Sequence, residues 1–161
     1  MAPATPALEV DVSRIDDRSE TQAEVPEVIR AFYHAFEQRD VTLLRAAVTE
    51  DWQYLPTLAP NSEAHGAGQM AAIFAHMSAA FPDIHIQILD VVANPQKVGV
   101  RAQVSGTQEG ELFGIQGSAK PVRFAIHSFH ELRDGLIART WHLEDWLSVF
   151  QQIGEFPGGT R

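Results

Sequence analysis

Residues 124–146 read FAIHSFHELRDGLIARTWHLEDW, and this stretch decides the fold. Two runs rich in aromatic and β-branched residues flank the dipeptide Asp134-Gly135. An Asp-Gly dipeptide in this setting is the strongest short-range signal of a β-hairpin, because a type I′ turn needs a positive φ at both central residues. The sequence therefore predicts two antiparallel strands joined at this turn.

The register of the hairpin follows outward from Arg133, which should lie opposite Leu136. Because side chains alternate across a strand, one face of the hairpin should then be mostly apolar. That face would carry the pairs Leu132 with Ile137, His130 with Arg139, Ser128 with Trp141, Ile126 with Leu143, and Phe124 with Asp145. The other face would carry a more polar set, namely Arg123, His127, Glu131, His142 and Glu144.

Asp145 is the first catalytic candidate, because it is the one carboxyl group on the predicted apolar face. Burial disfavours the charged form of a carboxyl group, which suits it to proton transfer. His130, on the same face, is a second polar candidate. The structural alternative for Asp145 is equally open from the residues alone, because Asp is a preferred N-cap for a helical turn over 146–148.

Candidate substrate-binding residues are the aromatic and aliphatic side chains that could form the wall of a cavity. They are Trp141, Leu143, Phe124, Ile126, Trp52, Tyr54, Phe74 and Phe113. For Trp52, Tyr54, Phe74 and Phe113, ordinary core packing is the competing interpretation.

Composition limits the classes of partner. The chain has 161 residues, which suits one domain, and 12 basic against 21 acidic residues give a formal net charge of −9. This charge argues against nucleic acid or an anionic membrane as partner. Cysteine is absent, which excludes disulfides and thiolate chemistry. No apolar run could span a bilayer and no secretory signal is visible, so a cytoplasmic location is expected.

Histidine is the residue type that raises a metal hypothesis, since the chain has 7 of them. His127 and His142 face each other in the predicted register, with Glu144 nearby, and such a set could hold zinc. A polar surface cluster is the favoured interpretation, and we expect neither metal nor cofactor.

The chain order predicts an α+β fold. Helical spacing extends over about 26–39, 42–48 and 66–81, and strand patterns follow over 84–92 and 98–104, after one short strand at 51–55. Helices followed by sequential strands indicate a curved, cone-shaped antiparallel sheet whose N-terminal helices enclose a pocket. Residues 25–154 would form this domain, and 155–161 a loose tail.

Residues 1–24 form a separate acidic arm. Within it, Leu8, Val10 and Val12 alternate with Glu9 and Asp11, which is a short strand pattern. An apolar row on a lone strand needs a sheet edge or groove. We expect this arm to pack onto the partner subunit of a homodimer.

Several fragments, in their order and spacing, resemble the SnoaL-like polyketide cyclases, a branch of the nuclear-transport-factor-2-like superfold. They are Phe81-Pro82-Asp83, Gly106-Thr107, residues 110–115, residues 134–137, Trp141, Asp145 and Gln152-Ile153-Gly154. The resemblance implies an α+β barrel-like domain, a homo-oligomer, an apolar small-molecule ligand and chemistry without cofactor. It also implies that Asp145 matches the acid–base aspartate of the polyketide-cyclising members.

Two positions depart from the family pattern. Gly106-Thr107-Gln108 stands where relatives often have Gly-Thr-His, and Gly117-Ser118-Ala119-Lys120 stands where they often have Thr-Gly-Lys. If that histidine takes part in the chemistry of relatives, the reaction of this chain would differ.

The expected function is therefore that of a cofactor-independent enzyme acting on an apolar, carbonyl-containing small molecule by acid–base proton transfer. Aldol cyclisation, as in polyketide and ester cyclases, or isomerisation fits best. The alternatives are an epoxide or ester hydrolase that uses the same Asp145, and a non-catalytic ligand-binding or oligomerisation module.

Overall fold

The computed structural model describes residues 24–56 and 65–158. Its elements within those ranges are α1 (Glu27–Gln38), α2 (Val41–Ala47), β1 (Val48–Pro56), α3 (Met70–Ala80), β2 (His85–Ala93), β3 (Lys97–Gln108), β4 (Lys120–Arg133), β5 (Leu136–Glu144) and α4 (Trp146–Ile153). The predicted α+β class is confirmed. The strand predicted in the N-terminal arm lies outside the described residues.

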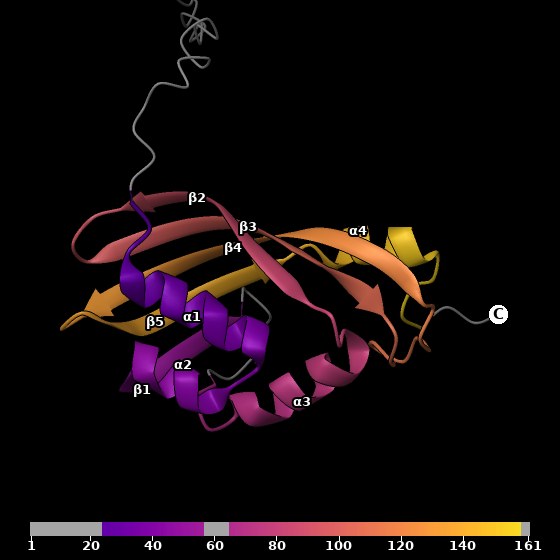
Figure 1. Cartoon of the computed structure of the whole chain (residues 1–161), viewed down its shortest axis with the longest axis horizontal. Helices are drawn as coiled ribbons and strands as arrows, with labels where there is room; N and C mark the ends of the chain where they lie inside the picture. The colour runs from indigo at the N-terminus through magenta and orange to yellow at the C-terminus, as the bar shows by residue number, and fades with distance from the viewer. Residues whose placement is uncertain (1–23, 57–64, 159–161) are drawn as a thin grey trace, which may run out of the picture.

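The strands form one curved, open sheet in the order β1-β5-β4-β3-β2 (Figure 1). The neighbours β2–β3, β3–β4 and β4–β5 are antiparallel, as predicted. β1, however, pairs with β5 in parallel, so the sheet is mixed rather than wholly antiparallel. β1 precedes the run of sequential strands and joins the sheet at its far edge, beside the last strand.

Helices α1, α2 and α3 lie on the concave side of the sheet (Figure 1). Helix α1 buries Ile29, Phe32 and Tyr33 toward the strands, which follows from their helical spacing. It ends at Arg39, whose φ of 54° is left-handed, and Asp40 then caps α2 by accepting from Thr42 N and Leu43 N. This tight break keeps α1 and α2 together over the sheet.

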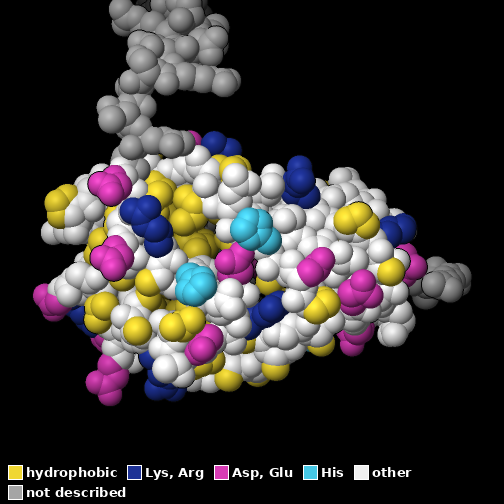
Figure 2. Space-filling view, in the orientation of Figure 1, with side chains coloured by type: hydrophobic (Ala, Val, Ile, Leu, Met, Phe, Trp, Pro, Cys, Tyr) yellow, Lys and Arg dark blue, Asp and Glu magenta, His cyan; other side chains and the backbone are white. Residues whose placement is uncertain are grey.

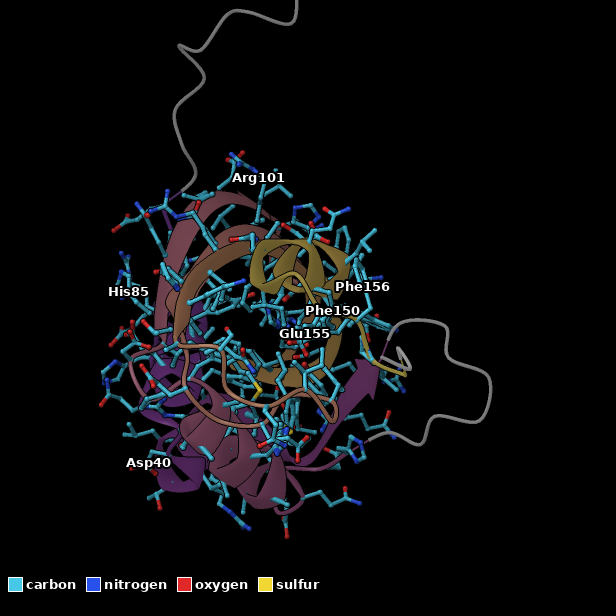
Figure 3. All side chains as sticks on the ribbon, turned by 90° about the vertical axis from the view of Figure 1, so that its right-hand side faces the viewer. Asp40, His85, Arg101, Phe150, Glu155 and Phe156 are labelled. Carbon is cyan, nitrogen blue, oxygen red and sulfur yellow. The ribbon has the colours of Figure 1, made fainter. Side chains whose placement is uncertain are left out.

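Helix α4 lies at the end of the sheet that faces the viewer in Figure 3, where Phe150 of this helix and Phe156 after it are labelled. The Gln152 side chain fixes this position by bonding both backbone groups of Arg123 on β4. Within the described ranges, no helix is long and apolar enough to cross a membrane.

The predicted turn at Asp134-Gly135 is confirmed. The φ angles of these residues are 53° and 79°, and Arg133 lies opposite Leu136. The predicted register fails two residues further on, because Leu132 pairs with Ile137 but Glu131 pairs with Arg139. Ala138 is therefore an extra residue on β5, which makes a β-bulge.

This bulge reverses the two faces of β5 relative to the prediction, because side chains alternate with a period of two residues. Trp141 now pairs with Phe129, Ser128 with His142, and Ile126 with Glu144. Thr140, His142 and Glu144 therefore share the inner face with Ile126 and Ser128. The prediction that Trp141, Leu143 and Asp145 face inward was wrong.

Gln108, which stands where relatives often have histidine, anchors the connection between β3 and β4. The residue is fully buried. Its Nε2 donates to the carbonyls of Gly110 and Gln116 at 3.0 and 3.1 Å, and its Oε1 accepts from Ser118 N. These bonds tie the side-chain amide to backbone groups of the irregular connection, so Gln108 shapes the fold.

Candidate active site

A cavity of about 230 Å³ lies between the helices and the concave face of the sheet. Most of its wall is aromatic or aliphatic, namely Phe32, Phe36, Met70, Ile73, Phe74, Met77, Ile84, Ile86, Val104, Phe124 and Ile126. The polar part of the wall consists of Tyr33, Arg39, Tyr54, His65, His142 and Glu144. An apolar cavity with a few convergent polar groups is the usual form of a small-molecule site.

Figure 2 shows the face that has helices α1 to α3 in its lower part and strands of the sheet above them. Hydrophobic side chains are exposed mostly on the left half of this face, where α1 and α2 lie, whereas acidic side chains are scattered over both halves. Apolar surface therefore reaches solvent next to the helices that cover the cavity.

His142 and Glu144 form an acid–base pair on the cavity wall. His142 Nε2 lies 3.4 Å from Glu144 Oε1, and His142 Nδ1 lies 2.8 Å from Ser128 Oγ. The His142 side chain is 8% exposed and that of Glu144 is 30% exposed. The imidazole is thus shielded from water between two partners, while the carboxylate keeps access to the cavity and to solvent.

Two tyrosines beside this pair are held in the protonated form. Burial raises the pKa of Tyr54 well above its usual value, and the charge of Glu144 raises it further. Burial also raises the pKa of Tyr33, although a hydrogen bond with Ser128 opposes the effect. Both side chains line the cavity, and the Tyr54 phenol, which stays protonated, can donate a hydrogen bond there.

His130 lies behind the cavity wall rather than on it. The residue is 1% exposed, its Nε2 lies 3.3 Å from Tyr33 Oη, and its Nδ1 lies 3.0 Å from Thr140 Oγ1. Burial lowers the pKa of His130 to about 3, and the repulsion that two protonated rings at His130 and His142 would feel adds to this effect. His130 is therefore neutral near pH 7 and is separated from the cavity by Tyr33.

We expect His130 to make the protein less stable in acid. Its pKa is about 3 when folded against 6.5 in a model peptide, so the unfolded chain binds more protons below pH 6.5. The contribution of His130 to stability is fully present above pH 6.5. The free energy of unfolding should then fall by about 1.4 kcal/mol per pH unit as the pH decreases toward 4. Urea unfolding at several pH values measures the loss.

His130→Gln should show a flatter dependence of unfolding free energy on pH than the wild type, since glutamine does not titrate. His127→Gln, on the exposed side of the same strand, is the control and should keep the wild-type slope. Parallel slopes for the wild type and His130→Gln would contradict the assignment.

Asp145 lies outside the cavity, so its predicted position was wrong. The residue is exposed, and its Oδ1 accepts a hydrogen bond from Ser148 N at 3.0 Å. Asp145 is thus the N-cap of α4, which is the structural alternative that the sequence left open. Trp141 is half-buried and Leu143 is 55% exposed, both away from the cavity wall.

Asp145→Ala should lower the free energy of unfolding by about 1 kcal/mol, the usual cost of losing an N-cap. Asp145→Asn should retain most of the stability, because asparagine caps almost as well. Thermal unfolding of both variants measures this difference. Equal losses in both would show that the cap does not matter.

The other predicted wall residues divide into two groups. Tyr54, Phe74, Phe124 and Ile126 line the cavity. Trp52 is instead buried core, 2% exposed, and its Nε1 donates to Thr140 Oγ1 at 3.1 Å. Phe113 is 51% exposed and contacts the rings of Trp146 and Phe150, which are both residues of α4.

The histidines do not assemble as the zinc hypothesis required. His127 pairs with Leu143 and His142 with Ser128, so the two imidazoles lie on opposite faces of the sheet. His85 lies at the start of the edge strand β2, against Glu37 of α1 (Figure 3). Among the described residues, no group of three or more acidic or imidazole side chains could hold a metal ion.

Sequence reasoning missed His142 and Glu144 as cavity residues. One signal could have found them: Thr140, His142 and Glu144 occupy alternate positions and so must share a face. The competing row of Trp141 and Leu143 is more apolar, and an apolar row normally faces inward. Ala138, where the register changes, carries no mark of a bulge in the sequence.

Comparison with known proteins identifies the class. The family model described as SnoaL-like polyketide cyclase matches residues 27–153, so this chain belongs to that family. Among curated proteins, none matches the chain.

Solved structures share the fold at low sequence identity. IdmH from Streptomyces antibioticus, a proposed polyketide cyclase, has a TM-score of 0.70 at 22% identity, covering 79% of this chain and 96% of its own. AclR from Streptomyces galilaeus, a proposed hydroxylase, has a TM-score of 0.70 at 18% identity, with coverages of 88% and 87%. A SnoaL-like polyketide cyclase from Agrobacterium tumefaciens has a TM-score of 0.65 at 16% identity, with coverages of 79% and 95%.

Proposed function

We propose that this protein is a cofactor-independent enzyme that transfers a proton on an apolar, carbonyl-containing small molecule. The observation that carries the proposal is the His142–Glu144 pair on the wall of an otherwise apolar cavity. Membership in the SnoaL-like polyketide cyclase family supports the same chemistry. Glu144 takes the role that the sequence interpretation gave to Asp145.

The reaction begins when the Glu144 carboxylate removes a proton from a carbon flanked by carbonyl groups. The C–H electron pair moves into an enolate, and Glu144 becomes a neutral acid. His142 holds the other side of the carboxylate through Nε2. A carboxylate held in one position needs little reorganisation before it accepts the proton.

The enolate oxygen requires a hydrogen-bond donor, and Tyr54 supplies one. The pKa of its phenol is raised by burial and by Glu144, so the phenol keeps its hydrogen at neutral pH. A donor fixed where negative charge develops, in a site with little water, stabilises the transition state strongly.

The second step depends on the substrate. The enolate carbon attacks a second carbonyl of the same molecule, and Glu144 returns its proton to the new alkoxide, which completes an aldol cyclisation. Alternatively, Glu144 returns the proton to another carbon, which completes an isomerisation. Apolar walls such as Phe74 and Phe124 hold the chain folded for either outcome.

Deuterium exchange at C2 of methyl 3-oxooctanoate tests the first step, because this ester combines an apolar tail with an acidic C–H bond. The wild type in weakly buffered D₂O should accelerate the exchange, followed by ¹H NMR, above the buffer rate. Binding measured by calorimetry without any acceleration would instead support a ligand-binding module. Hydrolysis of the ester without exchange would support a hydrolase.

A further inference from the structure

A chain of interacting polar side chains extends from the buried core to the cavity. Trp52 Nε1 meets Thr140 Oγ1 at 3.1 Å, and Thr140 Oγ1 meets His130 Nδ1 at 3.0 Å. His130 Nε2 then meets Tyr33 Oη at 3.3 Å, and the Ser128 side chain is close enough to the Tyr33 phenol to lower its pKa.

The chain ends at the candidate acid–base pair. Ser128 Oγ meets His142 Nδ1 at 2.8 Å, and His142 Nε2 lies 3.4 Å from Glu144 Oε1. We call the set Trp52, Thr140, His130, Tyr33, Ser128, His142 and Glu144 the buried relay. Its members come from α1, β1, β4 and β5 and so tie the helical layer to the sheet.

Both ends of the buried relay fix the same direction for its hydrogens. An indole N–H can only donate, so Trp52 donates to Thr140. An ionised carboxylate can only accept, so His142 must present Nε2–H to Glu144. In a neutral His142 the other nitrogen, Nδ1, is then unprotonated, and it must accept the hydrogen of the Ser128 hydroxyl.

The remaining hydrogens follow one by one. Ser128 has already donated its hydrogen, so it accepts from Tyr33. Tyr33 must then accept a hydrogen bond from His130 Nε2–H. The unprotonated Nδ1 of His130 accepts a hydrogen bond from the Thr140 hydroxyl. In this direction every donor hydrogen of the relay has one acceptor.

The opposite direction does not fit as well. His130 Nδ1–H would donate to Thr140 Oγ1, which already accepts from Trp52. The hydroxyl hydrogen of Thr140 would then have no acceptor in the relay. Thr140, Ser128 and His130 are each buried to 1% exposure or less, where an unpaired donor is costly.

We propose that the buried relay fixes the tautomers of His130 and His142, and that His130 is a positioning residue for the acid–base pair. This inference rests on the proposed function for the role of the pair, although the tautomers themselves do not depend on any reaction. Burial, which lowers the pKa of His130 to about 3, agrees with the neutral ring that the relay requires.

Long-range ¹H–¹⁵N correlation spectra of the full-length protein, with ¹⁵N-labelled histidine at pH 7.5, test the direction of the relay. The signals of the two rings are assigned by their loss in His130→Gln and His142→Gln. Both rings should carry hydrogen on Nε2 only. A wild-type His130 with hydrogen on Nδ1 would overturn the proposal.

Ser128→Ala separates the two ends of the relay, because Ser128 reaches His130 only through Tyr33. Without Ser128, the Trp52 indole still donates to Thr140, so His130 should keep its hydrogen on Nε2. Ser105→Ala on β3, outside the relay, should give the same spectrum for His130. A His130 hydrogen that moves to Nδ1 in Ser128→Ala would overturn the claim that the Trp52 end fixes the direction.

Kinetics separate positioning from simple stability. His130→Leu should lower kcat for C2 exchange of methyl 3-oxooctanoate about tenfold with little change in KM, comparable with the loss of outer partners of ligating imidazoles. His130→Gln should restore most of kcat, because an amide can donate to Tyr33 and accept from Thr140. Equal kcat values in His130→Leu and the wild type would overturn the positioning role.

The two proposals fail differently. If Glu144→Gln exchanges as fast as the wild type, the proposed function is wrong, while the tautomers can still match the relay. If the tautomers do not match, the relay is wrong, whatever the exchange rates are.

Discussion

Glu144→Gln should slow C2 exchange of methyl 3-oxooctanoate by about 10²–10⁴-fold, the usual contribution of a positioned general base. The amide has nearly the same shape as the carboxylate but cannot accept the substrate proton. Binding of the ester should change little, because apolar side chains supply most of the cavity wall. Exchange rates and calorimetric Kd values measured on the same preparation separate the two effects.

Glu131→Gln is the matched control for this substitution. Glu131 lies on the neighbouring strand and also has basic partners, Lys97 at 3.3 Å and Arg139 at 3.5 Å, but it is not part of the cavity wall. Its exchange rate should equal that of the wild type. A Glu144→Gln variant that keeps the full rate would remove Glu144 from the mechanism.

Trp52→Ala should lower the free energy of unfolding by about 3–5 kcal/mol, the range for deleting a large buried aromatic side chain. Trp52 is 2% exposed and packs against the rings of Phe32 and Tyr54 at 5.9 and 5.8 Å. Its loss also removes the donor to Thr140. Chemical denaturation followed by circular dichroism measures the change.

Trp141→Ala is the control, because the same side chain is deleted from the outer face of the sheet. Trp141 is half-buried, beside the exposed Phe129 and Leu143, so its loss should cost clearly less than that of Trp52. A larger loss for Trp141 than for Trp52 would indicate that the register around the bulge is different.

The elements of the fold could be predicted from local chemistry. The dipeptide Asp134-Gly135 determines its own turn, because few other residues adopt a positive φ twice in succession. The helical stripe of Ile29, Phe32 and Tyr33 requires an apolar surface to cover, which the sheet supplies. Such signals act over a few residues and do not depend on the rest of the chain.

The site could not be predicted in the same way, because one extra residue in β5 reverses the direction of every side chain that follows it in the strand. The bulge at Ala138 lies where β5 pairs with both β1 and β4, and it has no local signature in the sequence. A shift of one residue exchanges the faces of a strand completely. The sequence interpretation therefore placed Asp145 inside and His142 and Glu144 outside, whereas the structure places them the other way round.

The central claim is that β5 presents His142 and Glu144, rather than Trp141 and Asp145, to the ligand. Intermolecular NOEs between methyl 3-oxooctanoate and the aromatic rings of the wild-type protein test it most directly. Cross-peaks from the ester to the ring protons of His142 and Tyr54, with none to the indole of Trp141, are the predicted result. Cross-peaks to Trp141 with none to His142 would contradict the account.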